Sequence, residues 1–477
     1  MTTHNGLNFS KRTKHLVVIT PGGIFWLLWC LDYINHLVKS GETVVVVDLN
    51  QLTSKKKRRI KFQRLKNIYR INDEKVLISN LKDKEGVKFL RPRLFFSLKI
   101  WGTKFHKIHS IEFKNGLDAE FFEETGQRIL EEDILNRRAL IRSKIMFDFT
   151  FSRVLEIIKR EQITHMAVPG GRTLIPAACL SSGLSIGINC EILEFNDRGS
   201  LGYCCYSADF RKSCRVIQEE IMKNWDAAGF SKYEVAKEFL ENKLFRQNSK
   251  GIDFAGKFLS GQVIEEFREV SYVAFFLTSG FEFNSFPGEL QIGEFSKIDQ
   301  MEKVQQFCSI AKEFGYLPVV RAHPPRLGHE KISAIDDLEW SKFCVEIGAM
   351  YISTEDRLSS YELMKNSQLN AVYLSTAGID SLILGAQTII LGNAEYAQLV
   401  PELCAFNETS IRARFDKRVV DIDLNKILPY AYYMATLGTE LENSWVTPEG
   451  RVYYNGRELN RVRFSLVRYL VDKFKNL

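Results

Sequence analysis

The sequence predicts an α/β protein of two doubly wound domains, and three observations support this prediction. The chain has 477 residues, of which 45% are hydrophobic and 26% charged, enough to build two buried cores in a soluble protein. The N-terminal half contains two strand–turn–helix–strand patterns, each with a Pro-Gly-Gly turn. The C-terminal half contains further buried strands that end in small polar residues. Strands that alternate with helices are typical of parallel sheets with helices on both faces.

The first strand–helix pattern lies near the start of the chain. The apolar run His15–Thr20 predicts a buried strand, Pro21-Gly22-Gly23 a tight turn, and Ile24–Ser40 a helix. The valine-rich segment Thr43–Leu49 predicts the next strand. Because the turn lacks the full G-x-G-x-x-G pattern, a dinucleotide site is not expected here. The apolar stretch is also too short, and too interrupted by the turn, to predict a membrane span or a signal peptide.

The second pattern repeats the first. It runs from the predicted strand Ile163–Val168 through a Pro-Gly-Gly turn ending in Arg172 to the predicted strand Leu184–Leu193. We expect both turns at the same edge of one sheet, where open α/β sheets bind ligands, so Gly22, Gly23 and Arg172 are candidate binding residues. A helix start disfavours a cation, which indicates an anion-binding role for Arg172, and an ordinary surface arginine is the alternative.

Two carboxylates close the strand of the second pattern. Glu194 and then Asp197 are the candidates for a general base, because such groups at strand ends can face a ligand. The alternative for Asp197 is purely local, since Asn196-Asp197-Arg198-Gly199 is also a typical turn sequence.

The C-terminal half carries the motifs around which the chain is organised. Leu317–Pro325 predicts a strand ending in a His-Pro turn, and Leu369–Gly385 predicts a strand, a small-residue turn and a short helix. Ser375, Thr376 and Gly378 lie where that strand passes into the helix, so the first helical amides could bind a phosphate. The alternative is ordinary helix capping. Further candidate binding residues near these strand ends are Ser279, Glu282, Arg321, His323, Pro324, Asp380 and Tyr396. Asp380 could accept a ribose or sugar hydroxyl, and Tyr396 could stack on a base.

Charge is distributed unevenly along the chain. The formal net charge is +7, yet residues 1–115 alone carry 23 Lys and Arg against 8 Asp and Glu. The segment Lys55–Arg70 has nine basic residues among sixteen, with apolar residues between them. This pattern favours a surface that docks on anionic lipid, and a solvated face is the simpler alternative. Nucleic-acid binding is not expected, because no recognition module accompanies the run.

The metal-binding and redox signals are weak. Nine cysteines are present without a CxxC pair, so we expect a reduced, cytoplasmic protein with buried thiols and no zinc site. No DxD-like acidic pair stands in a loop between strands, so we expect no metal and no cofactor.

A family resemblance rests on two motifs. Arg321-Ala-His-Pro324, followed by Ser375-Thr-Ala-Gly-Ile-Asp380, resembles the donor-binding half of GT-B glycosyltransferases. The likeness is greatest to bacterial capsule and lipopolysaccharide enzymes that use CMP-linked Kdo or sialic acid. The resemblance implies two Rossmann-like domains facing a cleft, with His323 and the Ser375-Thr376 turn at the donor phosphate.

The resemblance also implies a function and a set of partners. The chain would move a sugar from a nucleotide-sugar to a glycan or lipid-linked glycan acceptor. A CMP-linked donor is favoured, and a UDP-linked donor is the alternative. Nucleotide-sugar 2-epimerases, teichoic-acid-type polyol-phosphate transferases and non-catalytic sugar-binding scaffolds are the alternatives. The protein would work in the cytoplasm, at the inner face of the bacterial inner membrane.

Domain boundaries complete the prediction. We expect an acceptor-side domain over residues 1–265, with a helical segment at 210–265, and a nucleotide-sugar domain over 266–455. A C-terminal helix over 456–477 would return to the first domain.

Overall fold

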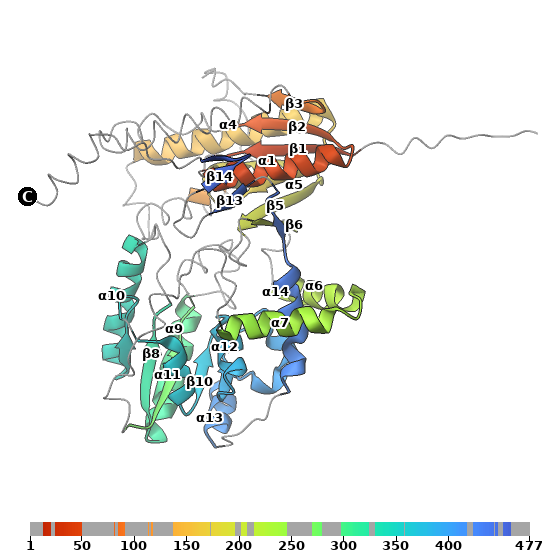
Figure 1. Ribbon diagram of the computed structural model, residues 1–477. Coiled ribbons are helices and arrows are strands. Elements are labelled where there is room, and N and C mark those ends of the chain that lie inside the picture. The colour runs from red at the N-terminus through yellow and green to blue at the C-terminus, as the bar shows by residue number, and fades with distance from the viewer. Residues whose placement is uncertain are drawn as a thin grey trace, which may run out of the picture.

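The computed structural model describes most of the regular structure of the chain. The described residues are 13–20, 24–49, 81, 84–90, 113, 116–117, 137–171, 173–195, 202–207, 214–245, 270–278, 297–323, 330–356, 358–416, 423–442, 444–446 and 452–458. They form an α/β protein with two large sheets, drawn one above the other in Figure 1, and a small third sheet.

The first sheet has seven strands in the order β12-β6-β5-β4-β1-β2-β3. The five strands from β5 to β3 are parallel. At the other edge β6 pairs antiparallel with β5, and β12 pairs antiparallel with β6. Their bounds are β1 Lys14–Ile19, β2 Thr43–Asp48, β3 Val87–Leu90, β4 His165–Pro169, β5 Asn189–Phe195, β6 Gly202–Ser207 and β12 Thr439–Glu440. β1 and β4 precede the two Pro-Gly-Gly sequences and are parallel neighbours, so their carboxyl ends lie at one edge, as predicted.

Helices cover both faces of this sheet. α1 (Ile24–Lys39) packs on one face, where its apolar residues meet the inward side chains of β1 and β2. α4 (Arg137–Glu161) and α5 (Leu174–Leu184) pack side by side on the other face. Because successive side chains of a strand point to opposite faces, each strand contributes to both cores.

The second sheet has five parallel strands in the order β11-β10-β7-β8-β9. The strands are β7 Tyr272–Phe276, β8 Leu317–Arg321, β9 Met350–Ile352, β10 Asn370–Val372 and β11 Thr388–Ile390. α9 (Lys297–Glu313), α10 (Glu330–Glu346) and α13 (Glu408–Asp416) adjoin one core. The other core takes in α11 (Ser360–Asn366), α12 (Ala377–Ile383) and α14 (Leu428–Thr436).

Two helices lie in a different place from the one predicted. α6 (Cys214–Ala227) and α7 (Lys232–Phe245) pack on α14, and Ile217 and Leu240 join the core of the second sheet. The sequence prediction assigned this segment to the first domain. The difference arises because the amphipathic pattern of a helix fixes which face is buried, not which sheet covers it.

The chain returns to the first sheet after α14. Figure 1 shows the chain rising from α14 toward the first sheet. β12 pairs with β6, Leu441 joins the α1 core, and Lys39 forms an ion pair with Glu442. A small antiparallel sheet of β13 (Ser444–Val446), β14 (Val452–Tyr454) and β15 (Arg457–Glu458) follows. The return is thus made by strands, and the predicted helix over 456–477 lies almost wholly outside the described residues.

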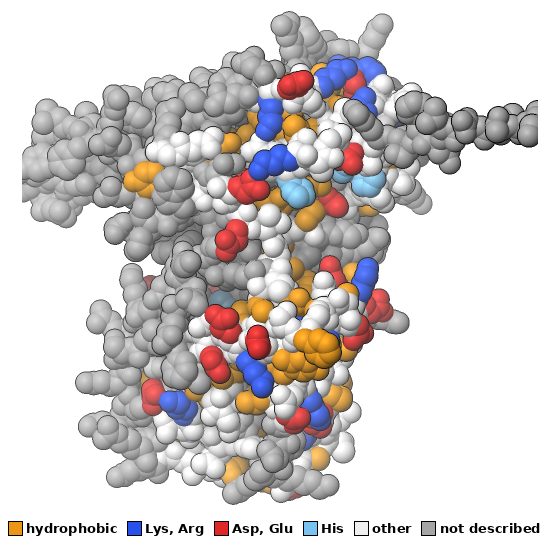
Figure 2. Space-filling view, turned by 45° about the vertical axis from the view of Figure 1, so that its right-hand side comes forward, with side chains coloured by type: hydrophobic (Ala, Val, Ile, Leu, Met, Phe, Trp, Pro, Cys, Tyr) orange, Lys and Arg blue, Asp and Glu red, His pale blue; other side chains and the backbone are white. Residues whose placement is uncertain are grey.

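Membrane and surface features are limited. In the described part of the chain, no helix has the length and apolar character needed to cross a membrane. On the face shown in Figure 2, acidic and basic side chains of the described residues are interspersed. The basic run Lys55–Arg70 lies outside the described residues.

A buried carboxylate links α4 to two strands of the first sheet. Glu161, at the end of α4, is only 6% exposed and lies 2.8 Å from the Lys88 ammonium on β3. The Arg160 guanidinium at 3.0 Å and the Lys14 ammonium at 3.6 Å complete the cluster. The hydrogen bond from Lys88, and then that from Arg160, hold the pKa of Glu161 well below its ordinary value, at about 2.

We expect Glu161→Gln to lower the free energy of unfolding at pH 7 by about 1–2 kcal/mol, since a charge-assisted hydrogen bond is lost near partly exposed cations. A depressed carboxyl pKa contributes stability above the unfolded pKa, and that stability is lost as the pH falls. The difference between wild type and variant should therefore shrink between pH 5 and pH 3, as measured by urea unfolding. A difference that stays constant over this range would show that Glu161 is not held ionised by the cluster.

Candidate functional site

The candidate site lies where the strand order of the second sheet reverses. β8 and β9 follow β7 on one side, whereas β10 and β11 follow on the other. The reversal therefore falls between β7 and β10. In open α/β sheets, ligands bind outside the carboxyl ends of the strands at this point.

Thr278 holds the two strand ends together. It is 2% exposed, and its hydroxyl accepts a hydrogen bond from the Leu374 amide at 3.1 Å, just beyond β10. The Thr278 amide donates to Gln300 Oε1 at 2.8 Å, and Gln300 in α9 is fully buried. The spacing between the ends of β7 and β10 is therefore fixed before any ligand binds.

The turn after β10 carries the predicted serine and threonine. Ser375 is 8% exposed, and its hydroxyl accepts from the Ala377 amide at 3.2 Å. The Gly378 amide donates to the Ser375 carbonyl, also at 3.2 Å. Thr376 is the exposed residue of the turn, and its side chain makes no capping hydrogen bond.

These contacts change the expected role of the turn. The amides of Ala377 and Gly378, predicted to bind a phosphate, already donate to Ser375. Thr376, in contrast, is exposed, and its hydroxyl makes no capping hydrogen bond. Ser375 thus shapes the turn, and Thr376 is the better candidate for ligand contact.

Tyr396 lies beneath the turn. It is 1% exposed, its hydroxyl donates to the Ser375 carbonyl at 2.6 Å, and its ring packs against Tyr430. Burial raises the pKa of Tyr396, so the hydroxyl stays protonated and remains a donor. A buried ring in this position does not stack on a base, contrary to the prediction, because the strand end folds back over it.

Tyr396 leaves no room for a side chain at position 378, which is a glycine. A Cβ at position 378 would overlap the Tyr396 hydroxyl and would lie 3.0 Å from Val372 Cγ2. We expect Gly378→Ala to lower the free energy of unfolding by about 1–3 kcal/mol through overpacking. Chemical denaturation should show the loss.

The matched variants isolate this clash. Tyr396→Phe in the Gly378→Ala background should recover part of the stability, because it removes the overlapping oxygen. Gly229→Ala is the control, since nothing lies within 4 Å of its Cβ position and its φ is not positive. Equal losses for Gly378→Ala and Gly229→Ala would contradict the packing argument.

Arg321 is buried against the loop that follows β9. It is 1% exposed, and its guanidinium donates to the carbonyls of Ser353, Asp356 (3.2 Å) and Leu358 (3.4 Å). The predicted contact with a substrate does not agree with this placement. Arg321 instead holds the loop after β9 against the end of β8, and so positions the residues that follow it.

His323 follows Arg321 by two residues. The intervening Ala322 amide donates to the Ile352 carbonyl at 2.9 Å, which keeps the chain paired with β9 up to the His-Pro turn. The imidazole is partly exposed beside the loop that Arg321 holds. A rigid backbone and a partly exposed ring are what a residue that contacts a ligand requires.

The His-Pro turn and the Ser-Thr turn are not on adjacent strands. β7 lies between β8 and β10, so the two strand ends are about 10 Å apart at the usual strand spacing. The prediction placed both groups on neighbouring strands around one anion. The observed spacing suits a longer group, such as a phosphate with its attached sugar, that spans the end of β7.

Asp380 is already paired. Its carboxylate lies 2.8 Å from the ammonium of Lys243 on α7, and its side chain is 14% exposed. Any hydroxyl ligand of Asp380 would have to share the carboxylate with Lys243. The pair also fixes α7 beside α12.

Glu194 lies near the carboxyl end of β5 in the first sheet. Alternation along β5 places it on the face of Cys190 and Ile192, which pack toward α4 and α5. It therefore stands on the same face as the start of α5, which follows the second Pro-Gly-Gly turn. The remaining predicted residues lie outside the described part: Gly22, Gly23, Arg172, Asp197, Ser279, Glu282 and Pro324.

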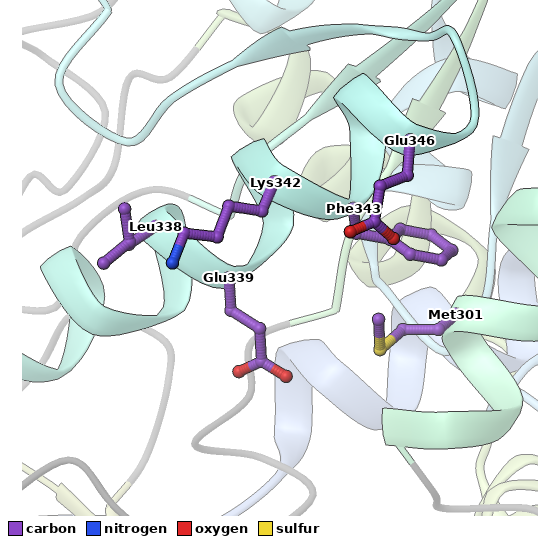
Figure 3. Close-up of a pocket in the computed structure, with 6 residues that line it drawn as sticks. All are labelled: Met301, Leu338, Glu339, Lys342, Phe343 and Glu346. Carbon is purple, nitrogen blue, oxygen red and sulfur yellow. The ribbon is translucent and has the colours of Figure 1, made fainter.

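A hollow on the second domain lies away from these strand ends. In Figure 3 the Glu346 carboxylate lies beside the Phe343 ring near Met301, whereas the Lys342 ammonium points toward Leu338, and Glu339 also lines the hollow. The lining comes only from α9 and α10, so the hollow does not belong to the candidate site. Within the described residues, His, Cys, Asp and Glu side chains form no group of three or more that could hold a metal ion.

Sequence reasoning missed residues that shape the site. The sequence did not identify Thr278, Gln300 or Lys243 as site residues. A polar residue directly after the apolar run of β7 was the available signal for Thr278. Gln300 and Lys243 gave no signal, because their partners are distant in sequence.

Comparison with known proteins gives structural likeness only. Neither a family model nor a curated protein sequence matches the chain. Two of the similar solved structures are Thermosulfurimonas dismutans KpsC transferases. The β-Kdo 2,4 transferase is 12% identical with a TM-score of 0.41, and the alignment covers 62% of this chain and 84% of that one. The β-Kdo 2,7 transferase is 12% identical with a TM-score of 0.33, and the alignment covers 69% and 96%.

A third similar structure is the Methanocaldococcus jannaschii UDP-GlcNAc 2-epimerase in complex with UDP-GlcNAc and UDP. It is 13% identical with a TM-score of 0.29, and the alignment covers 96% of this chain and 100% of the epimerase. At these identities and TM-scores, the similarity does not assign an activity to the chain.

Proposed function

We propose that this chain is a GT-B-type glycosyltransferase that binds a nucleotide-sugar at the carboxyl ends of β7, β8 and β10. The observation that carries the proposal is the strand reversal beside β7, flanked by the exposed Thr376 and the partly exposed His323. Both are hydrogen-bonding groups on rigid strand ends. They are placed to hold a phosphate and its sugar across the end of β7.

The proposed chemistry stabilises a departing phosphate without a metal ion. An imidazole N–H of His323 and the Thr376 hydroxyl would each donate to phosphate oxygens. A hydrogen bond to a charged group contributes about 1.5–3 kcal/mol, and more where charge develops in the transition state. The general base would be Glu194 on the first sheet, or Asp197, and it would accept the proton of the acceptor hydroxyl.

The finer assignments rest on the motifs. The resemblance of Arg321-Ala-His-Pro324 to enzymes that use Kdo or sialic acid supports a CMP-linked donor over a UDP-linked one. It also supports a capsule or lipopolysaccharide acceptor and a cytoplasmic site of action. Arg321 enters this proposal as a positioning residue, because its guanidinium is buried in the loop after β9.

The test is a thermal-shift panel of CMP, CDP, UDP and GDP compounds, followed by turnover of the nucleotide-sugar that binds, with and without chelator. We expect CMP to bind and EDTA to leave turnover unchanged. Conversion of a UDP-sugar without any acceptor would support an epimerase instead. Binding without turnover on any glycan acceptor would support a non-catalytic scaffold.

The basic run Lys55–Arg70 is proposed to hold the enzyme on anionic membrane. Each basic residue near such a surface contributes up to about 1 kcal/mol, and the attraction weakens with salt. We expect co-sedimentation with anionic vesicles that falls steeply as salt increases. Neutralising Lys55, Lys56, Lys57, Arg58 and Arg59 should abolish it, whereas salt-independent binding would count against the proposal.

A further inference from the structure

The first sheet has its own point of strand reversal, between β1 and β4. β2 and β3 follow β1 on one side, and β4 and β5 lie on the other. The carboxyl ends of β1 and β4 therefore form the edge at which an open α/β sheet binds a ligand. α5 begins at this edge, directly after β4.

The start of α5 is an unneutralised positive helix end. Thr173 occupies the N-cap position without a side-chain capping bond, and the first turn carries no acidic residue. The amides of Leu174 and Ile175 precede any intrahelical acceptor, and Pro176 has no amide hydrogen. Such a helix end favours an anion.

Two buried threonine hydroxyls at this edge lack a protein partner. Thr20, directly after β1, is 3% exposed, and its Oγ1 makes no hydrogen bond. Leu16 and Val18 belong to the core beneath α4 and α5, so strand alternation places Thr20 on that same face. A buried hydroxyl without a partner costs free energy, which a ligand at this position would recover.

Thr150 is the second such hydroxyl. It is 1% exposed on α4, and its Oγ1 also lacks a hydrogen bond. α4 leads into β4 and α5 leads into β5, so the two helices run in the same direction. Thr150 is 11 residues before the end of α4, and Leu174 is 10 residues before the end of α5. Phe147, one turn before Thr150, packs with Leu174. Thr150 therefore lies level with the first turn of α5.

The turn that leads to α5 is built to keep this edge compact. Gly170 and Gly171 have φ values of +70° and +54°, which favour glycine. A Cβ on Gly170 would lie 2.5 Å from the ring of Trp26, so this glycine is also needed for packing against α1. The backbone just after β4 therefore packs directly against Trp26 of α1.

We propose that the first turn of α5, with the hydroxyls of Thr20 and Thr150, binds a phosphate or carboxylate group of the acceptor. The assignment to the acceptor rests on the proposed function, whereas the anion site itself rests only on the structure. Glu194 stands on the next strand and the same face. An acceptor held by its anionic group at α5 would present a hydroxyl toward Glu194.

The test uses inorganic phosphate as the probe, titrated into the full chain and followed by calorimetry and thermal shift. We expect Thr20→Val and Thr150→Val each to weaken phosphate binding by about tenfold, the loss of one hydrogen bond to a charged group. Thr20→Ser keeps the hydroxyl and should bind phosphate nearly as well as wild type. Without phosphate, Thr20→Val should melt at or above the wild-type temperature, because valine removes a buried hydroxyl that has no partner.

Thr164→Val is the matched control. Thr164 precedes β4 at the opposite edge of the same sheet, and its hydroxyl is hydrogen bonded to Lys14 and His165. This variant should leave phosphate affinity unchanged. Equal phosphate binding by wild type and all four variants would overturn the proposal, as would the absence of phosphate binding.

A second measurement separates the acceptor from the donor. The affinity for CMP and UDP should be unchanged in Thr20→Val, because these nucleotides are proposed to bind at the second sheet. A parallel loss of nucleotide affinity would assign the anion site to the donor and overturn the proposal. Failure of sugar transfer with intact phosphate binding would count against the proposed function alone.

Discussion

Replacing His323 with alanine is expected to lower kcat about 10²- to 10³-fold, the usual effect of removing one preorganised donor to developing charge. The contact should tighten as the phosphate departs, so most of the loss should appear in kcat, with a smaller change in nucleotide affinity. Steady-state kinetics with the nucleotide-sugar, combined with calorimetry of the free nucleotide, separates the two effects.

The control for this variant is His165→Ala. His165 begins β4, at the edge of the first sheet formed by the amino-terminal ends of its parallel strands, and its ring contacts Asn189 and Thr164. It should leave kcat near the wild-type value. Full activity of His323→Ala would remove the imidazole from the mechanism, and abolition of wild-type activity by EDTA would remove the metal-independent chemistry.

Glu194→Gln is expected to lower turnover by about 10²-fold or more, the usual contribution of a general base. The amide keeps the shape of the side chain but cannot accept the acceptor proton. Nucleotide affinity should stay near wild type, since Glu194 lies in the first sheet and the donor is proposed to bind at the second.

Glu191→Gln serves as the matched control. Glu191 lies on the same strand but on the opposite face, where it accepts a hydrogen bond from the Tyr33 hydroxyl at 2.5 Å. Its replacement should affect stability more than turnover. If Glu194→Gln and Asp197→Asn both retain full activity, the base lies elsewhere.

Local patterns predicted the elements of the fold well. The valine-rich runs and the Pro-Gly-Gly sequences predicted β1, α1, β2 and β4, and the pairing of β1 with β4 confirms that these two strands end at one edge. The repeat was informative because a strand that feeds a helix through a tight turn leaves its carboxyl end at one edge of the sheet.

The strand order of the second sheet could not be read in the same way. The His-Pro and Ser-Thr motifs follow β8 and β10, and only long-range pairing places β7 between them. The packing of α6 and α7 on the second sheet depends likewise on distant partners. Periodicity identifies a buried face, but it does not name the surface that covers it.

Buried polar residues were the main source of error at the site. Arg321 and Tyr396 stand beside the motifs, and their residue types are typical of ligand contacts. In the structure both side chains donate hydrogen bonds to backbone carbonyls, Arg321 to the loop after β9 and Tyr396 to Ser375. Their partners lie 21 or more residues away, so sequence alone could not distinguish a ligand contact from an internal hydrogen bond.

The most direct test of the central claim is hydrogen–deuterium exchange of the full chain with and without saturating nucleotide, using CMP first. The donor site proposed here predicts protection of the backbone around residues 317–323 and 372–380, after β8 and β10, and no protection at the carboxyl ends of β1 and β4. Protection confined to the first sheet, or no protection at either segment of the second sheet while nucleotide is bound, would contradict it.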